Sequence, residues 1–392
     1  MFKGIKSLPA DPILKLTQLC KNDPRSEKID VGVGIFMNEK GDTPILNTVK
    51  KAEKIILETE ITKKYQPISG NPEFTEAVGN LILKNSFDKN RVRINQATGG
   101  TGALRVIADT IKSLNPQAKI WIPNPTWGNH LAIFGAAIEI DRYPYLDSNT
   151  FEVDREAVFS ALEKLGENDT VLLHGCCHNP SGADFSQEDW KKIAELANKN
   201  GFTPIIDFAY AGFGEGLDED AWGVRYIVEN VAQSLIAVSC SKNFALYKER
   251  AGAVIAVGSN KEEAAAIQTH MNAEGRKLVS MPPDHPAAIV ATILNNSELN
   301  QEWQQELIAM CQLIRSRREK LEKALKEIAG LDWSFITSHN GMFSLLPLGE
   351  ERVLRLREEF AIYMVGTGRI NLVGLRTDEM ISHFANSIKA VI

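Results

Sequence analysis

The residue best placed for covalent chemistry is Lys242, in the segment Ser239-Cys-Ser-Lys-Asn243. This segment directly follows an Ile- and Val-rich run that ends at Val238, a pattern typical of a buried strand. Ligands of parallel sheets bind beyond the carboxyl ends of the strands, so a lysine beside two serine hydroxyls could form a Schiff base with a carbonyl compound there. A lone lysine is usually a solvated surface residue, and only position and neighbours favour a functional role here. Arg250 follows eight residues later, and its planar guanidinium could bind a phosphate group.

Polar side chains also follow two other apolar runs. Asp207 closes the run Pro204-Ile-Ile-Asp207, where an unpaired buried carboxylate would be costly. It could keep a ring nitrogen protonated, or it could serve as a helix cap or a structural ion pair. Tyr210 and Asn179 could each donate a hydrogen bond to a ring oxygen. The turn chemistry of Asn-Pro-Ser-Gly is, however, sufficient by itself to explain the segment that contains Asn179.

A glycine-rich turn, Thr98-Gly-Gly-Thr-Gly102, precedes a helical pattern that starts at Ala103. Gly100 lets the backbone approach an anion closely, Thr101 adds a hydroxyl, and the N–H groups of the first helical turn point at the ligand. Such turns are also common for purely structural reasons. Trp127 follows another apolar run and could stack on a flat ring, or it could simply pack in the core.

The composition bounds the class of protein. With 392 residues, 44% apolar and 24% charged, the chain can build a large core in two lobes. A net charge of −6 gives no sign of a nucleic-acid surface, and no apolar run approaches a membrane span. Five cysteines without paired spacing, and an N-terminus without a targeting pattern, predict a cytoplasmic protein. No cluster of histidine, cysteine and aspartate has metal-ligand spacing, so we expect no metal site.

Short apolar runs alternate with helical patterns along the first three quarters of the chain. The run of helical spacing at 188–199 is one example, with Trp190 and Ile193 on one face. This alternation predicts an α/β protein with a mostly parallel sheet. The expected strands are Lys119–Pro123, Thr170–His174, Thr203–Asp207 and Ser234–Ser239.

A long amphipathic helix, or a broken pair, is predicted at 296–329. Beyond it, two strand-like pieces (342–346 and 369–373) flank a helical one (350–361), which indicates a smaller α+β domain. We therefore expect an N-terminal arm at 1–12, a small domain at 13–44 and 312–392, and a large domain at 45–311.

Taken together and in order, these segments resemble the class I pyridoxal-5′-phosphate aminotransferases, in particular their aspartate and aromatic branch. The resemblance covers essentially the whole chain, and its strength lies in the number of motifs in register. The matching segments are Ala10-Asp-Pro-Ile-Leu14, Gly99-Gly-Thr-Gly-Ala-Leu-Arg105, Asn124-Pro-Thr-Trp-Gly-Asn-His130, His174-Gly-Cys-Cys-His-Asn-Pro-Ser-Gly182, Asp207-Phe-Ala-Tyr210, Ser239-Cys-Ser-Lys-Asn-Phe244, Glu249-Arg250, Asn340-Gly-Met-Phe-Ser344 and Gly368-Arg-Ile-Asn371.

The resemblance implies fold type I, with a large domain that binds the cofactor, and it implies a role for each matching residue. Lys242 would hold pyridoxal 5′-phosphate covalently and move the substrate proton, while Asp207 would pair with the ring nitrogen. The other implied cofactor ligands are Tyr210 and Asn179 at the ring oxygen, Trp127 stacked on the ring, and Gly100, Thr101, Ser239, Arg250 and the partner subunit's Tyr65 at the phosphate.

Substrate binding follows from the same resemblance. Arg369 would bind the substrate α-carboxylate beside the backbone of Gly34, and Arg276 of the partner subunit would bind a distal carboxylate. Trp127 and Asn179 would also contact the substrate. These roles imply a homodimer with two shared active sites, which transfers amino groups between amino acids and 2-oxo acids.

Some residues depart from the family pattern. Ala245 stands where the family usually has glycine, and Ser181 replaces a threonine. Apolar residues replace more polar or aromatic ones before the Pro-Pro pair and line the mouth of the expected site: Leu278, Val279 and Met281, with Ile35, Phe36 and Met37. This apolar rim predicts activity on aromatic as well as dicarboxylic amino acids (Tyr, Phe, Trp, Asp, Glu), with 2-oxoglutarate or oxaloacetate as acceptor.

Four alternatives remain at this stage. The chain could be an aspartate aminotransferase with little aromatic activity. It could be a lyase or decarboxylase on the same fold, although two arginine carboxylate clamps, Arg276 and Arg369, argue against that. It could be a phosphate- or nucleotide-binding protein, but the glycine-rich turn lacks the Lys-Ser/Thr pair of a P-loop. It could also be an inactive structural homologue.

Overall fold

The computed structural model describes residues 2, 4–7, 12–84 and 87–392, and these form two compact units. Unit 1 comprises Met1–Asp42, Leu313–Ser338 and Met342–Ile392; unit 2 comprises Thr43–Gln312 and His339–Gly341. Residues 1, 3 and 8–11 of the predicted N-terminal arm, which include part of the Ala10–Leu14 motif, lie outside the described residues.

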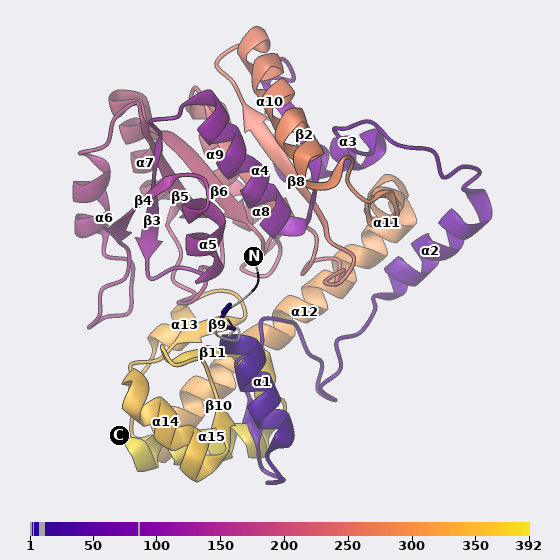
Figure 1. Cartoon of the computed structure of the whole chain (residues 1–392). Helices are drawn as coiled ribbons and strands as arrows, with labels where there is room; N and C mark the ends of the chain where they lie inside the picture. The colour runs from indigo at the N-terminus through magenta and orange to yellow at the C-terminus, as the bar shows by residue number, and fades with distance from the viewer. Residues whose placement is uncertain (1, 3, 8–11, 85–86) are drawn as a thin grey trace. The chain divides into compact units, whose positions relative to one another are not determined.

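Unit 2 is built on a sheet of seven strands in the order β2-β8-β7-β6-β5-β3-β4 (Figure 1). Strand β8 runs antiparallel to both of its neighbours, and the remaining neighbouring pairs are parallel, so the predicted mostly parallel sheet is confirmed. The strands are β2 (Val92–Thr98), β3 (Lys119–Asn124), β4 (Glu139–Pro144), β5 (Asp169–His174), β6 (Thr203–Phe208), β7 (Ser234–Ser239) and β8 (Ala251–Val257).

Helices pack against this sheet, and the most buried of them, α4, presents apolar side chains at helical spacing to it. Leu104 and Ile107 of α4 join Ile120 and Ile205 of the strands in one continuous core. The helices of unit 2 are α2 (Asn47–Thr59), α3 (Pro72–Leu83), α4 (Gly99–Leu114), α5 (Asn129–Gly135), α6 (Arg155–Leu162), α7 (Gln187–Asn200), α8 (Leu217–Asp220), α9 (Trp222–Asn230), α10 (Lys261–Val279) and α11 (Asp284–Asn295).

Helix α7 shows how local sequence sets these boundaries. Ser186 accepts a hydrogen bond from the backbone N–H of Asp189, and the Asp189 carboxylate accepts from the backbone N–H of Ser186, which forms a capping box. The helix ends at Gly201, whose φ of 85° is left-handed and suits glycine. Both signals are local, and the predicted helix at 188–199 agrees with α7 to within a residue at each end.

Helix α12 (Ser297–Ala324) spans the boundary between the units, and the wider π-helical turn η1 (Leu325–Ala329) continues it. The predicted long helix at 296–329 is therefore one helix with a change of winding at its end.

Unit 1 contains two small sheets, in which β1 pairs with β10 in parallel and β9 pairs with β11 antiparallel. Its core holds Leu321, Ile362 and Phe384, all fully buried. The elements are α1 (Pro12–Asn22), β1 (Ile29–Asp30), α13 (Phe335–Ser338), β9 (Phe343–Leu345), α14 (Gly349–Phe360), β10 (Ile362–Tyr363), β11 (Arg369–Asn371), the 3₁₀ turn η2 (Leu372–Gly374) and α15 (Asp378–Val391).

Thr43, Pro44 and Gln312, at the expected domain boundaries, group with unit 2 and not with the small domain, and so does one short internal segment. His339–Gly341, expected in the small domain, belongs to unit 2. Nδ1 of His339 lies 3.1 Å from the carbonyl oxygen of Ser181, and the backbone N–H of Asn340 donates to the carbonyl of Gly182 at 2.9 Å. These hydrogen bonds attach the segment to the loop that follows β5.

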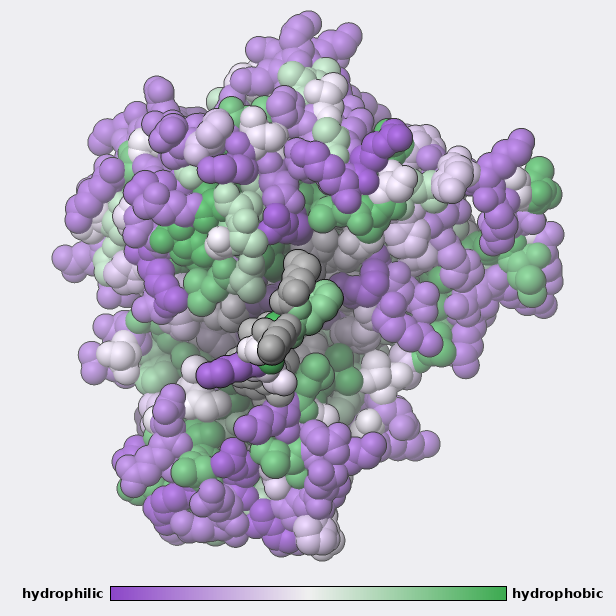
Figure 2. Space-filling model, in the orientation of Figure 1, coloured by the Kyte–Doolittle hydropathy of each residue, from purple (hydrophilic) through white to green (hydrophobic). Residues whose placement is uncertain are grey.

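The visible face of the molecule is mainly hydrophilic, with apolar residues in separate patches (Figure 2). Among the residues that the structure describes, no helix is both long and apolar enough to cross a membrane.

Candidate active site

Lys242 lies three residues beyond the end of β7, among buried neighbours. Its Nζ atom lies 4.6 Å from the centroid of the Tyr210 ring. Burial lowers the pKa of the Lys242 amine to about 8; Arg250 adds to this lowering, and Asp207 opposes it. Near pH 7 a lysine with this pKa is partly neutral, and the neutral amine is the form that attacks a carbonyl carbon.

Asp207 is the fifth residue of β6, and its two carboxylate oxygens have different surroundings. Oδ2 accepts a hydrogen bond from Nε2 of His130 at 3.0 Å. Oδ1 is buried and has no hydrogen-bond partner among the described residues. Burial tends to raise the pKa of this carboxyl, but the hydrogen bond from His130 and the electrostatic interactions with His130, His174 and Lys242 outweigh it, so the pKa is lowered. Asp207 is thus an anion with one oxygen open to a cationic donor.

A chain of hydrogen bonds, which sequence reasoning missed, supports Asp207 from behind. The Thr126 hydroxyl lies 2.8 Å from Nδ1 of His130 and 3.2 Å from Nε2 of His174. The backbone N–H of Asn179 donates to Nδ1 of His174 at 3.4 Å. Burial and the nearby His130 lower the pKa of His174 to about 3, so His174 is neutral at pH 7. His130 lay within a quoted motif, but nothing in its spacing indicated a contact with Asp207.

The amino end of α4 is shaped to accept an anion. The N-cap residue Thr98 makes no side-chain cap, which leaves the N–H groups of the first turn to other partners. A Cβ atom on Gly99 would lie 2.6 Å from a guanidinium nitrogen of Arg250. A Cβ atom on Gly100 would lie 3.1 Å from Cβ of Ser239. The structure therefore brings the predicted phosphate ligands Gly100, Ser239 and Arg250 together.

The orientation of Arg250 is fixed by its own neighbours. Its Nη1 atom donates to the Ser241 hydroxyl at 3.2 Å and to the carbonyl of Tyr247 at 2.6 Å. Thr101 is exposed in the first turn of α4. Both residues are thus available to the anion that the α4 terminus attracts.

Ala245, three residues after Lys242, has a φ of 53°. This left-handed conformation is favourable for glycine and costly for alanine. The structure therefore explains why the family usually has glycine there, and it shows that this chain tolerates a strained residue beside its key lysine.

Asn179 lies in the loop that follows β5, and the Asp184 side chain holds the backbone of this loop. The Asp184 carboxylate accepts hydrogen bonds from the backbone N–H groups of Cys177 and His178 at 2.8 and 2.9 Å. Burial raises the pKa of Asp184 to about 6. Ser181 keeps the hydroxyl that a threonine would provide, with its Oγ 2.7 Å from Nδ1 of His178. Asp184 is another residue that sequence reasoning missed.

Trp127 contacts His130 through its ring. Its ring packs edge-on against His130, with 5.1 Å between centroids and an interplanar angle of 85°. The indole remains partly exposed, so a face of the ring is available for stacking.

In unit 1, Arg369 begins β11 and is 5% exposed. Its Nη2 atom donates to the carbonyl of Gly32 at 2.6 Å, and its guanidinium carbon lies 4.5 Å from the ring centroid of Phe343. A Cβ atom on Gly34 would lie 3.4 Å from Cζ of the same ring. Arg369 and Gly34, which are predicted to act together, therefore lie next to the same side chain of this unit, that of Phe343.

Tyr65 and Arg276 are not part of the Lys242 cluster within this chain. Tyr65 is 92% exposed in the loop after α2, and Arg276 is exposed in the last turn of α10. The two segments meet, because the backbone N–H of Gln66 lies 3.0 Å from Sδ of Met281. Both side chains are thus exposed to solvent, on adjacent segments of unit 2.

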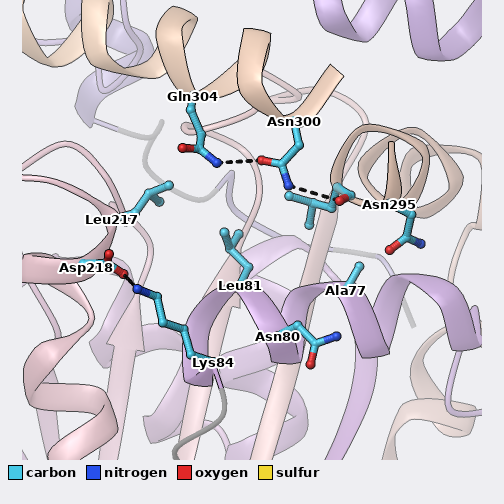
Figure 3. Close-up of a pocket in the computed structure, with 10 residues that line it drawn as sticks. Ala77, Asn80, Leu81, Lys84, Leu217, Asp218, Asn295, Asn300 and Gln304 are labelled. Atoms are coloured by element: carbon cyan, nitrogen blue, oxygen red, sulfur yellow. Dashed lines mark hydrogen bonds and ion pairs between the residues drawn. The ribbon is translucent and has the colours of Figure 1, made fainter. Parts of the chain in front are cut away.

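A separate polar cavity of about 420 Å³ lies between α3, α8 and the helices around Leu294 (Figure 3). Its one lysine, Lys84, is 2.6 Å from Asp218 in an ion pair. The side-chain amide of Asn300 accepts from Gln304 at 2.8 Å. None of the predicted catalytic residues lines this cavity, and its lysine is paired with a carboxylate, so the cavity is no candidate for lysine chemistry.

One group of potential metal ligands occurs among the described residues: Cys176, Cys177 and Asp220, whose ligand atoms lie within 4.8 Å of one another. Burial raises the pKa of the Cys177 thiol to about 12 and that of Cys176 as well, which keeps both thiols protonated. Asp220 accepts hydrogen bonds from backbone N–H groups, including that of Gly212 at 2.8 Å. Metal binding would have to displace two tightly held protons, which these surroundings oppose.

Comparison with known proteins places this geometry in a family. A model of aminotransferase class I and II matches residues 26–388. An aspartate aminotransferase of Salmonella typhi is 44% identical over 385 residues, which cover 97% of each chain. An aromatic-amino-acid aminotransferase of Paracoccus denitrificans is 41% identical, with 99% of each chain covered. A solved structure of an aromatic-amino-acid aminotransferase from Burkholderia pseudomallei, covalently bound to pyridoxal phosphate, has a TM-score of 0.96 at 39% identity and covers 100% of this chain and 99% of its own. The chain belongs to the class I and II aminotransferases.

Proposed function

We propose that this chain is a pyridoxal-5′-phosphate-dependent aminotransferase that accepts both aromatic and dicarboxylic amino acids, with 2-oxoglutarate or oxaloacetate as acceptor. The observation that carries the proposal is the presence of two groups in one site: Lys242, whose pKa is about 8, and the anionic Asp207, whose Oδ1 is open. The proposal includes a ping-pong sequence, a cytoplasmic location and a homodimer with shared active sites.

The described residues fit the cofactor. The open Oδ1 of Asp207 can accept the N–H of a protonated pyridine ring. The amino end of α4, with Ser239 and Arg250 against Gly99 and Gly100, can hold a phosphate. Asn179 and Tyr210 would donate to the ring oxygen, Trp127 would stack on the ring, and Thr101 would add a phosphate contact.

When bound, pyridoxal phosphate supplies an aldehyde that carries the amino group and a ring that accepts electrons. Lys242 would bind the cofactor covalently and, as a neutral amine, take and return the proton of the substrate α-carbon. Asp207 would keep the ring nitrogen protonated, because its lowered pKa keeps the carboxylate charged. His130, Thr126 and His174 would hold Asp207 in position through their hydrogen bonds.

Two arginines would bind the substrate carboxylates. Arg369, with Gly34, would bind the α-carboxylate that every amino acid carries. Arg276 of the partner subunit would bind the distal carboxylate of aspartate or glutamate, and the partner subunit's Tyr65 would complete the phosphate site. The exposure of Arg276 and Tyr65 within one chain supports roles in a neighbouring site, because neither side chain is buried in its own unit.

The breadth of specificity rests on the apolar residues near these arginines. Leu278 and Val279, which follow Arg276, are 44% and 42% exposed, so an apolar surface lies next to a charged side chain. An aromatic ring would contact this surface, while Arg276 turns toward solvent. The alternative, an aspartate aminotransferase with little aromatic activity, is favoured by the relatives that are named for aspartate.

The test begins with the absorbance spectrum of the purified protein. We expect a visible band from bound cofactor that changes with pH and that both aspartate and phenylalanine bleach in a single turnover. A Lys242→Ala protein should keep its circular dichroism spectrum but lose turnover. Absence of a cofactor band after reconstitution would contradict the proposal. Bleaching by aspartate alone would instead establish the narrower aspartate activity.

Mixing two inactive variants tests the shared site. Each Lys242→Ala subunit still supplies Arg276, and each Arg276→Leu subunit still supplies Lys242. A heterodimer of the two should therefore contain one complete site and regain activity with aspartate. Subunit exchange is verified with two affinity tags, and exchange without recovered activity would contradict the shared arrangement.

A further inference from the structure

A cavity of about 190 Å³ lies at the end of the seven-stranded sheet of unit 2 where the parallel strands begin. It lies where β5, β6 and β7 begin, beside the end of the antiparallel β8 and against α4 and α10. None of the residues proposed above to bind cofactor or substrate lines it.

The cavity and the cofactor ligands lie at opposite ends of the same strands. Ser234 begins β7 and lines the cavity, whereas Ser239 ends β7 beside Gly100. Ser239 is five positions after Ser234 in the extended strand, and at about 3.3 Å per residue the distance is about 16 Å. A molecule in the cavity therefore cannot touch the cofactor ligands.

The lining is mainly apolar. Ile111 and Leu114 of α4 face Leu235 of β7, Val257 of β8 and Ile267 of α10 around the cavity. An apolar cavity of about 150 Å³ in another protein binds benzene. A cavity of about 190 Å³ thus has room for one aromatic ring with a small substituent.

One polar atom in this lining lacks a partner. Ser234 is 1% exposed, and its hydroxyl oxygen makes no hydrogen bond to any described residue. Thr170, the other buried polar side chain in the lining, donates to the carbonyl of Lys119 at 2.9 Å. At the rim, Asn115 donates to Asn168 at 2.8 Å. A buried hydroxyl without a partner is unfavourable, and a ligand with one hydrogen-bonding group would satisfy it.

We propose that this cavity is a second binding site, for a small aromatic molecule that carries a single hydroxyl or amino group. The ring would contact the five apolar side chains, and the polar substituent would hydrogen-bond to Ser234. The site is independent of the transamination chemistry, because it lies at the opposite end of the strands.

Phenol and toluene test this assignment, because they match in size and differ in the hydroxyl group. Dissociation constants of both are measured by titration calorimetry on the purified protein. We expect phenol to bind about five- to tenfold more tightly than toluene, the difference that one net hydrogen bond gives. In Ser234→Ala the preference should disappear, because the partner hydroxyl is gone.

A second variant locates the binding site. Leu114 is 45% exposed at the rim, so Leu114→Trp can fill the mouth of the cavity without disturbing the core, and binding of both ligands should be lost. Ile308→Trp is the matched control, since Ile308 is 46% exposed on α12 and does not line the cavity. Circular dichroism verifies folding of each variant. Failure of either ligand to bind, an unchanged phenol preference in Ser234→Ala, or full binding to Leu114→Trp would each overturn the proposal.

Discussion

The two charges that act on Lys242 can be removed one at a time, and the pKa of the amine should then move in opposite directions. Asp207 raises this pKa and Arg250 lowers it, against a dominant lowering by burial to about 8. Asp207→Asn should therefore move the pKa below about 8, and Arg250→Gln should move it above. At pH 7 an amine with a pKa of about 8 is about 9% neutral, whereas one at 10.5 is about 0.03% neutral, a difference of about 300-fold.

The assay is competitive labelling of the cofactor-free protein with a trace of amine reagent, followed by mass spectrometry of the peptide that contains Lys242. The rate is measured across pH 6–11, with N-acetyl-lysine amide as the internal standard. Burial can slow access of the reagent, but it does not change the midpoint of the pH profile. A midpoint near 10.5 in the wild type, or shifts of the same sign in both variants, would refute the reasoning.

The remaining predictions concern stability and specificity. Ala245→Gly should raise the free energy of unfolding in urea by about 0.5–1 kcal/mol, because glycine adopts the φ of 53° without strain; an unchanged midpoint would contradict this. Thr126→Val should lower that free energy by about 1–3 kcal/mol, since two buried ring nitrogens lose their partner, while Thr126→Ser should not. The folded-state pKa of His174 is lowered to about 3, so its contribution to the free energy of unfolding is fully present above pH 6.5 and decreases as the pH falls. Between pH 7 and 5 the free energy of unfolding of the wild type should therefore fall by about 2 kcal/mol, a loss that His174→Gln does not show. Arg276→Leu should slow the single turnover with aspartate about 100-fold, the loss of two charge-assisted hydrogen bonds, and leave phenylalanine nearly unchanged; Arg369→Leu should slow both, and equal losses in Arg276→Leu would refute the switching model.

The strands and the residues that end them were predictable because their signals are local. The run 234–239 has four apolar residues, 235–238, between two serines, and the structure has β7 at the same residues. A strand buried on both faces needs no partner information to be recognised. The direction of β8 was not predictable in this way, because Ala251–Val257 is also buried throughout and a continuous apolar run does not encode direction.

The contacts around Asp207 needed knowledge of the sheet order. β3 pairs with β5, and β4, which lies between them in sequence, is at the edge. This crossover places the segment after β3, which holds Thr126 in the loop and His130 in the first turn of α5, next to the ends of β5 and β6. Sequence spacing alone gave 44 residues between His130 and His174 and 77 between His130 and Asp207, with nothing to connect them.

The direction of each hydrogen bond in that chain follows from its first donor. A backbone N–H can only donate, so Nδ1 of His174 accepts from Asn179, and the neutral ring carries its proton on Nε2. Nε2 of His174 then donates to the Thr126 hydroxyl, whose own hydrogen has Nδ1 of His130 as its acceptor among the described residues.

His130 must then carry a proton on Nε2 and donate it to Oδ2 of Asp207. Each ring is held in one tautomer, and the last donor always faces the carboxylate. The loop that contains Asn179, the proposed donor to the ring oxygen, thus also stabilises the charge of Asp207. In the proposed function this charge must persist for the ring nitrogen to stay protonated. A single hydroxyl, that of Thr126, connects the two, and this explains why valine and serine at this position should differ in effect.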